Sequence, residues 1–422
     1  MTAQTAAAGS CPFAFGRRGF VRAAVGAGAA LTVGAATPAV AVAVAATAEH
    51  PGPRRTVPFH GARQAGITTP AAGFAAFAAF DVRARGRAGL ETLLRTVTDR
   101  ARFLTAGGTP PADGPADNGV VGPSVPADNL TLTVGVGASL FDDRYGLGAA
   151  KPVRLGPMPA FRGDRLRPAE TGGDLSLQIC ADSRDTVLHA LLDVVRAANG
   201  ALRPRWRLDG FRNEARPDGA QRNLMGFKDG IVNPDTADER RMDRVVWVAD
   251  GGGEPAWAGG GTYQVLRTIR MRVEAWENLP VETQERIIGR RRDTGAPLDG
   301  LLETDLPDYT KDPDGLVTPR RAHIRLANPR TADTDDSLLL RRAYNYDRGV
   351  DRDGTLDMGL LFCCYNQDLA RQFETMQRRL VGEPLADYLT VTGGGYFFVL
   401  PGIADAADWY GRTLLAAGGT GG

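Results

Sequence analysis

The sequence predicts an α+β protein made of two ferredoxin-like sandwiches, of the dimeric α+β barrel type, and three observations support this fold class. Short segments with alternating side chains are typical of strands, and helical stripes of apolar residues lie between them. The order of strands and helices in the first half is repeated in the second half. With 422 residues, of which 43% are hydrophobic, the chain has ample material for a core.

The first half contains two strand–helix–strand units, the arrangement of a ferredoxin-like sandwich. Strands are expected at Gly73–Val82, Leu130–Gly137, Asp174–Cys180 and Arg203–Phe211. Helices are expected at 90–104 and 187–195, where leucines and valines recur at helical spacing. His189 lies off the apolar stripe of the second helix, so we expect its side chain to be exposed.

The second half offers the same kinds of element with longer connections. Strands are expected at Arg244–Ala249, Thr262–Val273, Met358–Tyr365 and Gly394–Leu400. Helices are expected from Asn278 to about Arg290 and over the apolar stripe Leu369, Phe373, Met376 and Leu380. The segment 291–340 is a long connection inside a compact domain, and such a segment usually has a functional role. We therefore expect it to wrap a ligand.

The first 48 residues are interpreted as an export signal of the twin-arginine type. Arg17 and Arg18 precede a run of Ala, Val and Gly that ends in a small-residue cleavage site before Glu49. A transmembrane anchor is the alternative, because about 24 apolar residues could span a bilayer. Ala and Gly insert weakly, however, which favours the export signal. Because the twin-arginine route carries folded proteins, it suits a protein that receives a cofactor before export.

This interpretation sets the domain boundaries and the location. We expect the signal at 1–48, an N-terminal ferredoxin-like domain at 49–215 and a C-terminal one at 216–422. The mature protein is expected outside the cell or in the cell envelope, with no membrane span after processing.

Charge and composition exclude several classes of protein. The 50 basic and 49 acidic residues leave a formal charge of +1, so there is no bulk electrostatic reason to bind nucleic acid or an anionic membrane. The four cysteines form no CxxC pair, which makes a zinc or iron–sulfur site improbable. Only four histidines are present, His50, His60, His189 and His323, so histidine-dependent chemistry has few candidates.

Three segments of the second half carry residues suited to chemistry, although each is a weak signal alone. The segment 226–234 has glycines on both sides of Asp229, which could be an ordinary Asp-Gly turn. The segment 322–330 holds His323 between arginines, where a histidine is more often a satisfied polar residue than a ligand. The segment 338–346 contains Arg341 and Arg342 and could be an ordinary basic strand end.

Taken together and in this order, the three segments resemble the dye-decolourising peroxidase family, in particular its twin-arginine-exported branch with the deferrochelatase/peroxidase of bacterial iron-uptake operons. Gly226 with Asp229-Gly230 matches the family's G-x-x-D-G signature, and His323 matches its haem-ligand segment. Arg341 in L-R-R-x-Y matches its distal arginine. The resemblance covers essentially the whole mature chain, and it implies one haem b per chain, bound in the second sandwich.

The resemblance also implies roles for these residues. His323 would be the axial ligand of the haem iron, with Asp387, or alternatively Glu383, accepting a hydrogen bond from its other nitrogen. Asp229 would move the proton of hydrogen peroxide, and Arg341 would hold the charge that develops as the O–O bond breaks. An aspartate in this role predicts an acidic optimum, because carboxylates ordinarily stay ionised at a lower pH than imidazoles stay neutral.

The remaining haem contacts implied by the resemblance are Gly230, Ile231, Val232, Asn328, Pro329, Arg330 and Phe362. Arg330 would pair with a haem propionate. Phe362 could equally be plain core, and Cys363 and Cys364 are expected to pack as small buried side chains. Ile231 replaces a threonine that many relatives carry, which removes one pocket hydrogen bond.

Two functions remain open on the sequence alone. The first is a peroxidase that uses hydrogen peroxide to oxidise bulky dyes and phenolic compounds. The second is a deferrochelatase that frees iron while leaving the porphyrin intact, or a haem carrier. Both need the same iron site. The expected partners are hydrogen peroxide, bulky aromatic reductants, components of an iron-uptake system, and a second copy of the chain in a homodimer.

Overall fold

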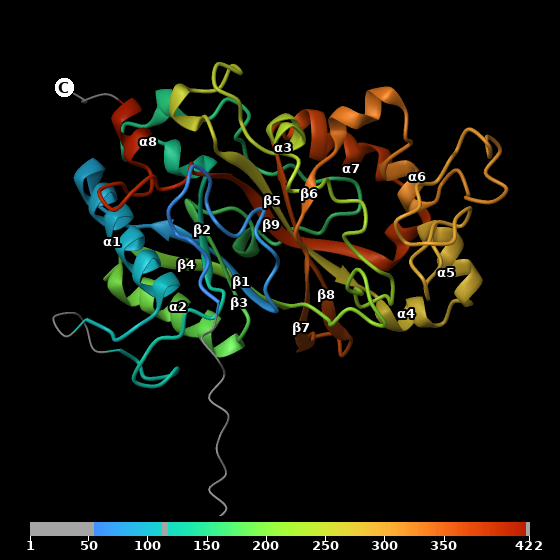
Figure 1. The fold of residues 1–422 in the computed structure, drawn as a ribbon, viewed down its shortest axis with the longest axis horizontal. Helices are drawn as coiled ribbons and strands as arrows, with labels where there is room; N and C mark the ends of the chain where they lie inside the picture. Colours follow the sequence, from blue (N-terminus) through green and yellow to red (C-terminus); the bar gives the residue numbers. More distant parts are fainter. Residues whose placement is uncertain (1–54, 112–116, 419–422) are drawn as a thin grey trace, which may run out of the picture. The chain divides into compact units, whose positions relative to one another are not determined.

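The computed structural model describes residues 55–111 and 117–418 (Figure 1). The predicted export signal at 1–48 lies outside these residues. In the described part of the chain, no helix is long and apolar enough to cross a membrane. The predicted α+β class is confirmed, since helices alternate with strands that pair antiparallel throughout.

The strands form one sheet that closes on itself. Residues 55–111 and 117–418 contain nine strands: β1 (Phe74–Val82), β2 (Thr131–Gly137), β3 (Leu175–Ala181), β4 (Leu202–Phe211), β5 (Thr262–Met271), β6 (Leu340–Arg341), β7 (Tyr344–Val350), β8 (Leu356–Asn366) and β9 (Leu389–Val399). Their order is β5-β9-β2-β3-β1-β4-β7-β8, and β8 pairs back onto β5. The short β6 also pairs with β8, next to the ladder made by β7. The result is an eight-stranded antiparallel barrel.

Each half of the chain contributes four neighbouring strands to this barrel. The first half supplies them in the order β2-β3-β1-β4, and the second half in the order β9-β5-β8-β7. The halves meet edge to edge through β2–β9 and β4–β7. The sheet is therefore continuous, and both faces of its central strands are buried.

Alternation along β1 shows how the sheet divides the core. Ala76, Ala78 and Phe80 belong to the cluster that packs against the helices, whereas Ala75, Phe77 and Ala79 belong to a second cluster. Two-residue periodicity places these two sets on opposite faces of the strand. The six side chains are all at most 3% exposed, so β1 has no solvated face.

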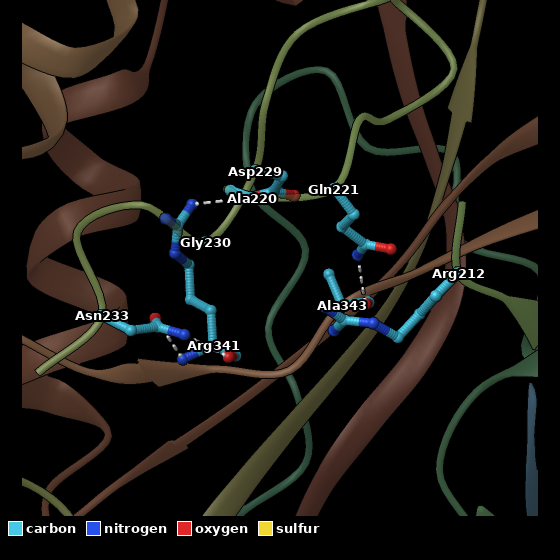
Figure 2. Close-up of a pocket in the computed structure, with 8 residues that line it drawn as sticks. All are labelled: Arg212, Ala220, Gln221, Asp229, Gly230, Asn233, Arg341 and Ala343. Carbon is cyan, nitrogen blue, oxygen red and sulfur yellow. Dashed lines mark hydrogen bonds and ion pairs between the residues drawn. The ribbon is translucent and has the colours of Figure 1, made fainter. Parts of the chain in front are cut away.

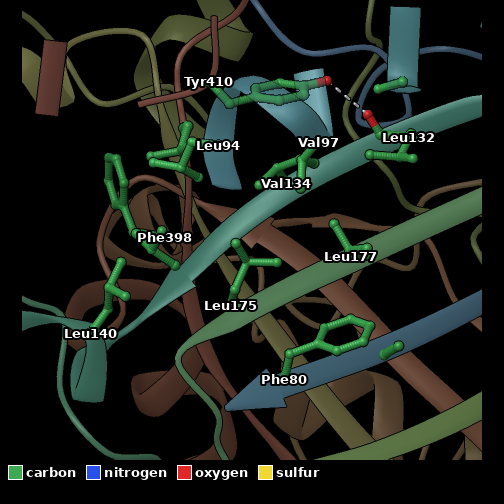
Figure 3. Packing of buried hydrophobic residues seen from close by; sticks show 14 of the residues in the cluster. Phe80, Leu94, Val97, Leu132, Val134, Leu140, Leu175, Leu177, Phe398 and Tyr410 are labelled. Carbon is green, nitrogen blue, oxygen red and sulfur yellow. Dashed lines mark hydrogen bonds between the residues drawn. The ribbon is translucent and has the colours of Figure 1, made fainter. Parts of the chain in front are cut away.

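Two helices cover the first half of the sheet, α1 (Gly86–Ala106) and α2 (Arg184–Ala197), which contact each other (Figure 1). Leu94 and Val97 of α1 lie over Leu132 and Val134 of β2 in the core (Figure 3). The Tyr410 hydroxyl donates to the Leu132 carbonyl at 3.1 Å, so this buried phenol is satisfied. Burying each such Leu or Val side chain stabilises the folded state by about 1.5–3 kcal/mol relative to leaving it exposed.

The prediction that His189 is exposed is wrong. Its side chain is fully buried, and Nε2 lies 2.8 Å from Oδ2 of Asp117 in the loop that follows α1. Leu192, expected within the apolar stripe of α2, is instead 44% exposed. The buried face of α2 therefore differs from the predicted apolar stripe, because a loop and α1, as well as the sheet, cover this helix.

The helices of the second half are short. They are α3 (Glu239–Val245), α4 (Val273–Glu277), α5 (Val281–Ile288), α6 (His323–Ala327), α7 (Thr375–Leu380) and α8 (Arg412–Ala417). Helix α8 lies beside α1, at the opposite end of the molecule from α4, α5 and α6 (Figure 1). The strand expected at 244–249 is wrong, because α3 occupies its start. Asp238 caps that helix by accepting from the backbone N–H of Arg241 at 3.0 Å. The segment 291–340 is largely irregular apart from α6 and the 3₁₀ helix Ala332–Ser337, as expected.

Candidate active site

A hairpin-like loop between β4 and α3 presents Asp229. Arg222 and Lys228 form an antiparallel bridge, and the backbone N–H of Asp229 donates to the Gln221 carbonyl at 2.8 Å. Gly226 has a φ of 85° at the turn, a conformation that glycine adopts without strain. These contacts hold the Asp229 backbone in place and aim its carboxylate into a cavity.

Asp229 pairs with Arg341 across that cavity. Nη1 of Arg341 lies 3.1 Å from Oδ1 of Asp229, and the two side chains are 28% and 13% exposed. The cavity has a volume of about 200 Å³. Its lining residues, shown in Figure 2, are Arg212, Ala220, Gln221, Asp229, Gly230, Asn233, Arg341 and Ala343. A carboxylate and a guanidinium from segments more than a hundred residues apart thus share one small polar chamber.

Asn233 fixes the backbone of Arg341. Its Nδ2 donates to the Arg341 carbonyl at 2.7 Å, and its Oδ1 accepts from the Arg341 N–H at 3.0 Å (Figure 2). The amide therefore ties the loop of Asp229 to the strand of Arg341. Sequence reasoning did not assign this role, although Asn233 lies within the Asp229 segment.

Arg341 and Arg342 point to opposite sides of their strand. Arg342 is 5% exposed, and its guanidinium donates to the carbonyls of Thr69 and Pro70. It does not line the cavity. Strand alternation therefore leaves Arg341 as the guanidinium of this pair that faces Asp229.

His323 opens α6, and its imidazole is held by a carboxylate. Nδ1 lies 2.7 Å from Oε2 of Glu383, whose side chain is 6% exposed. Burial acts to lower the pKa of His323, but the charge and hydrogen bond of Glu383 outweigh it, so the pKa lies above its usual value. The charges of Arg341 and Asp229 also act on this pKa, in opposite directions.

The expectation that Asp387 holds His323 is wrong. Asp387 is exposed at the fourth position of a short 3₁₀ helix, Pro384–Tyr388, and Glu383 immediately precedes that helix. Glu383 is buried against the imidazole because the chain turns outward after it. The alternative identified in the sequence is therefore the one that the geometry favours.

Comparison with known proteins shows the family. Residues 64–212 match the model described as Dyp-type peroxidase, N-terminal, and residues 220–404 match Dyp-type peroxidase, C-terminal. The chain belongs to the Dyp-type peroxidase family. It is thus related to haem-dependent peroxidases, and the resemblance inferred from the three segments is confirmed.

Several relatives of this Dyp-type peroxidase carry a more specific name. A deferrochelatase of Yersinia pseudotuberculosis is 48% identical over 368 residues, 85% of each chain. A deferrochelatase of Escherichia coli K12 is 48% identical over 367 residues, 85% of this chain and 87% of the relative.

Solved structures of the same family are similar as well. A DyP-type peroxidase from Cellulomonas bogoriensis has a TM-score of 0.78 and 38% identity, covering 86% of this chain and 99% of its own. Ferric DtpA from Streptomyces lividans has a TM-score of 0.78 and 37% identity, covering 86% and 98%.

The other predicted site residues of this Dyp-type peroxidase divide into three groups. Gly230 lines the cavity with Asp229, and Ile231 and Val232 follow it as half-buried residues. Asn328, Pro329 and Arg330 follow α6, and Oδ1 of Asn328 accepts from the Arg330 N–H at 3.0 Å. Phe362 does not line the cavity and packs against Phe373, with ring centroids 6.0 Å apart.

A cluster of guanidiniums lies near Arg341. Nε of Arg330 is buried without a hydrogen-bond partner in the described part of the chain. Burial, together with the nearby charges of Arg330 and Arg341, lowers the pKa of Arg290. Cations gathered in this way, one of them incompletely paired, are suited to an anionic group such as a carboxylate.

Cys363 and Cys364 are free, fully buried thiols, as expected. Burial raises the pKa of Cys363 to about 12, which keeps the thiol protonated. These residues therefore lack the thiolate character that a reactive cysteine needs.

Proposed function

We propose that this Dyp-type peroxidase binds one haem b per chain in its C-terminal half, where His323 would hold the haem iron. It then uses hydrogen peroxide to oxidise bulky dyes and phenolic compounds. The observation that carries the proposal is the pairing of His323 with Glu383. With Nδ1 facing a carboxylate at 2.7 Å, Nε2 is left as the ring nitrogen for a metal.

The residues around His323 fit a haem. The buried, unpartnered Nε of Arg330 and the neighbouring Arg290 supply positive charge for the two propionates. Gly230 leaves room beside Asp229, since a Cβ at this position would meet only the Asn233 amide nitrogen, at 3.9 Å. We assign Gly230, Ile231, Val232, Asn328, Pro329 and Phe362 as further haem contacts.

Asp229 and Arg341 have different roles in the cleavage of peroxide. Haem, when bound, would supply the redox-active iron for this reaction. Asp229 accepts the proton of the inner peroxide oxygen and delivers it to the outer one, so that water leaves. Arg341 stabilises the negative charge that develops on the departing oxygen, and it never deprotonates. Asn233 holds the Arg341 backbone during this step.

The second candidate function is iron release from haem, and the deferrochelatase names of the relatives favour it. Both functions use His323, so the test must read out the products. Haem-loaded protein is mixed with peroxide and an anthraquinone dye, and separately incubated with excess haem under reducing conditions. Dye bleaching without metal-free porphyrin fluorescence supports the peroxidase. Porphyrin fluorescence without bleaching would overturn it in favour of the deferrochelatase.

We further propose two ferredoxin-like domains, at 49–215 and 216–422. The strand orders β2-β3-β1-β4 and β9-β5-β8-β7 support this division, because each has a first and third strand at the centre of its half. We also propose twin-arginine export through residues 1–48 to the cell envelope or beyond, a homodimer, and contact with an iron-uptake system. Replacing Arg17 and Arg18 by lysine and locating the precursor tests the export route.

A further inference from the structure

Arg212 is a cation of the cavity that the peroxide chemistry does not use. It follows β4 directly, its backbone N–H donates to the Gly73 carbonyl at 2.9 Å, and its side chain lines the cavity (Figure 2). Within residues 55–111 and 117–418, its guanidinium forms no ion pair or hydrogen bond. Arg341, in contrast, is paired with Asp229.

Arg212 is half-buried, and its surroundings disfavour the charge of its guanidinium. Burial is the main cause that lowers the pKa of Arg212, and Arg342 adds to it, whereas Tyr344 and Asp229 act in the opposite direction. A guanidinium stays charged in proteins even so. A charge that has lost part of its hydration is stabilised when an anion binds beside it.

The charge balance of the cavity indicates the charge of such an anion. Two guanidiniums, Arg212 and Arg341, and one carboxylate, Asp229, are the charged groups that line it, which leaves one positive charge. A monoanion neutralises that excess. A dianion such as phosphate would be repelled by Asp229 in the same small space.

The shape of the cavity and of the guanidinium narrows the chemistry further. A guanidinium offers a planar fork of N–H donors that matches a carboxylate in two parallel hydrogen bonds. The cavity of about 200 Å³ is larger than the roughly 150 Å³ cavity that takes up benzene in an engineered protein. A carboxylate on a single aromatic ring therefore fits.

The side chain of Gln221, which also lines the cavity, is not fully hydrogen-bonded by other protein groups. Its side chain is 6% exposed and lines the cavity, and its Oε1 has no partner in the described part of the chain. Its Nε2 donates to the Ala343 carbonyl at 3.3 Å, a long contact. An unused hydrogen-bond acceptor thus remains in the cavity that Arg212 lines.

We propose that Arg212 forms a binding site for one small aromatic monocarboxylate inside the cavity, separate from the Asp229–Arg341 pair. The inference rests on the proposed function, in which the natural occupant is a phenol that carries a carboxylate. Such a reductant enters the cavity, whereas bulky dyes react from outside.

Calorimetric titration of the haem-loaded protein with benzoate, which does not react, tests the proposal. We expect one benzoate per chain, with affinity at least tenfold lower in Arg212→Gln and intermediate in Arg212→Lys, which keeps the charge without the fork. Arg207→Gln is the matched control, because Arg207 is an exposed arginine of β4 paired with Asp209 at 2.6 Å. Benzamide, the neutral analogue, should bind wild type at least tenfold more weakly than benzoate.

Three results would overturn the site. Equal benzoate affinity in Arg212→Gln and wild type would exclude Arg212, and equal affinity for benzamide would exclude carboxylate recognition. Absence of benzoate binding to wild type, together with reduced haem content in Arg212→Gln, would assign Arg212 to a haem propionate instead. Haem content and peroxide turnover of the same wild-type preparation are measured alongside, since their absence contradicts the proposed function rather than this site.

Discussion

Asn233 hydrogen-bonds both backbone groups of Arg341, the carbonyl at 2.7 Å and the N–H at 3.0 Å. Asn233 lies four positions after Asp229 in the chain, and Arg341 is the partner of Asp229 at 3.1 Å. The amide thus fixes the separation of the two groups that act on peroxide, although Asn233 itself takes part in no proton transfer.

Asn233→Ala should therefore slow peroxide cleavage about tenfold while the protein still folds and binds haem. Losing the two hydrogen bonds frees the Arg341 backbone, at a cost of about 1 kcal/mol for each bond. Asn233→Asp keeps the acceptor for the Arg341 N–H and should fall between alanine and wild type. The rate of the spectral change after rapid mixing with peroxide measures this effect.

Asn213→Ala is the matched control for that experiment. Asn213 is exposed in the same connection, and its Nδ2 donates to the Arg222 carbonyl at 2.9 Å. A loss in Asn213→Ala equal to that in Asn233→Ala would show that the effect comes from the loop as a whole.

Asp229 and Arg341 should differ in the size of their contributions. We expect Arg341→Leu to slow peroxide cleavage by about 10³, in line with loss of a preorganised charge donor. Asp229→Asn should cost about 10² and flatten the acid side of the pH profile, because a bound water can replace part of its proton transfer. The exposed Asp235 of the same loop provides a control, as Asp235→Asn. A near-normal rate in Arg341→Leu would contradict this division.

Glu383 and Asp387 can be distinguished by paired substitutions. Glu383→Gln keeps a hydrogen-bonding side chain beside His323 but removes the charge, so the imidazole becomes less basic. We expect a higher haem reduction potential and about 10–100-fold slower peroxide cleavage. Asp387→Asn should leave both unchanged, because Asp387 is exposed. The reverse pattern, measured by spectroelectrochemistry, would restore Asp387 as the partner of His323.

The sequence predicted the site residues that can be recognised from their own local segment. It failed for the residues whose role depends on contacts with distant segments. Asp229, Arg341 and His323 lie in distinctive local segments, and His323 is one of only four histidines, so their pattern could be recognised. Glu383 could not be preferred over Asp387, because only the direction of the chain after Glu383 determines which carboxylate is buried. Asn233 and Arg212 were missed for a similar reason, since each depends on a contact with a distant segment.

The same difference between local signals and distant contacts applies to the fold. Strands β1 to β5, β8 and β9 were predicted near their observed positions, since alternation is a local signal. The strand expected at 244–249 is wrong because its apolar residues Val245, Val246 and Trp247 pack around the end of a helix instead. Closure of the barrel depends on the pairing of β5 with β8, which no local pattern reveals.

Stability should fall at acid pH through Asp174. Burial acts to raise the pKa of Asp174, but Arg144, Ser139 and the backbone N–H of Val82 outweigh it, so the folded-state pKa lies below the usual value. Its contribution is present above the unfolded-state pKa of about 3.9 and is lost as the pH falls through the folded-state value.

Asp174→Asn should lower the free energy of unfolding by roughly 2 kcal/mol at pH 6. The difference from wild type should shrink as the pH is lowered towards 3. Urea unfolding at several pH values measures this, with exposed Asp353→Asn as the control. A difference that does not depend on pH would show that Asp174 stabilises through packing alone.

The haem spectrum of His323→Gly tests the central claim most directly. We predict that this variant loses the Soret band or holds haem weakly, and that added imidazole restores the band by entering the space left by the side chain. His60→Gly, at an exposed histidine of the same chain, should bind haem like wild type. A His323→Gly variant with a wild-type haem spectrum in the absence of imidazole would contradict the assignment of the ligand and the account built on it.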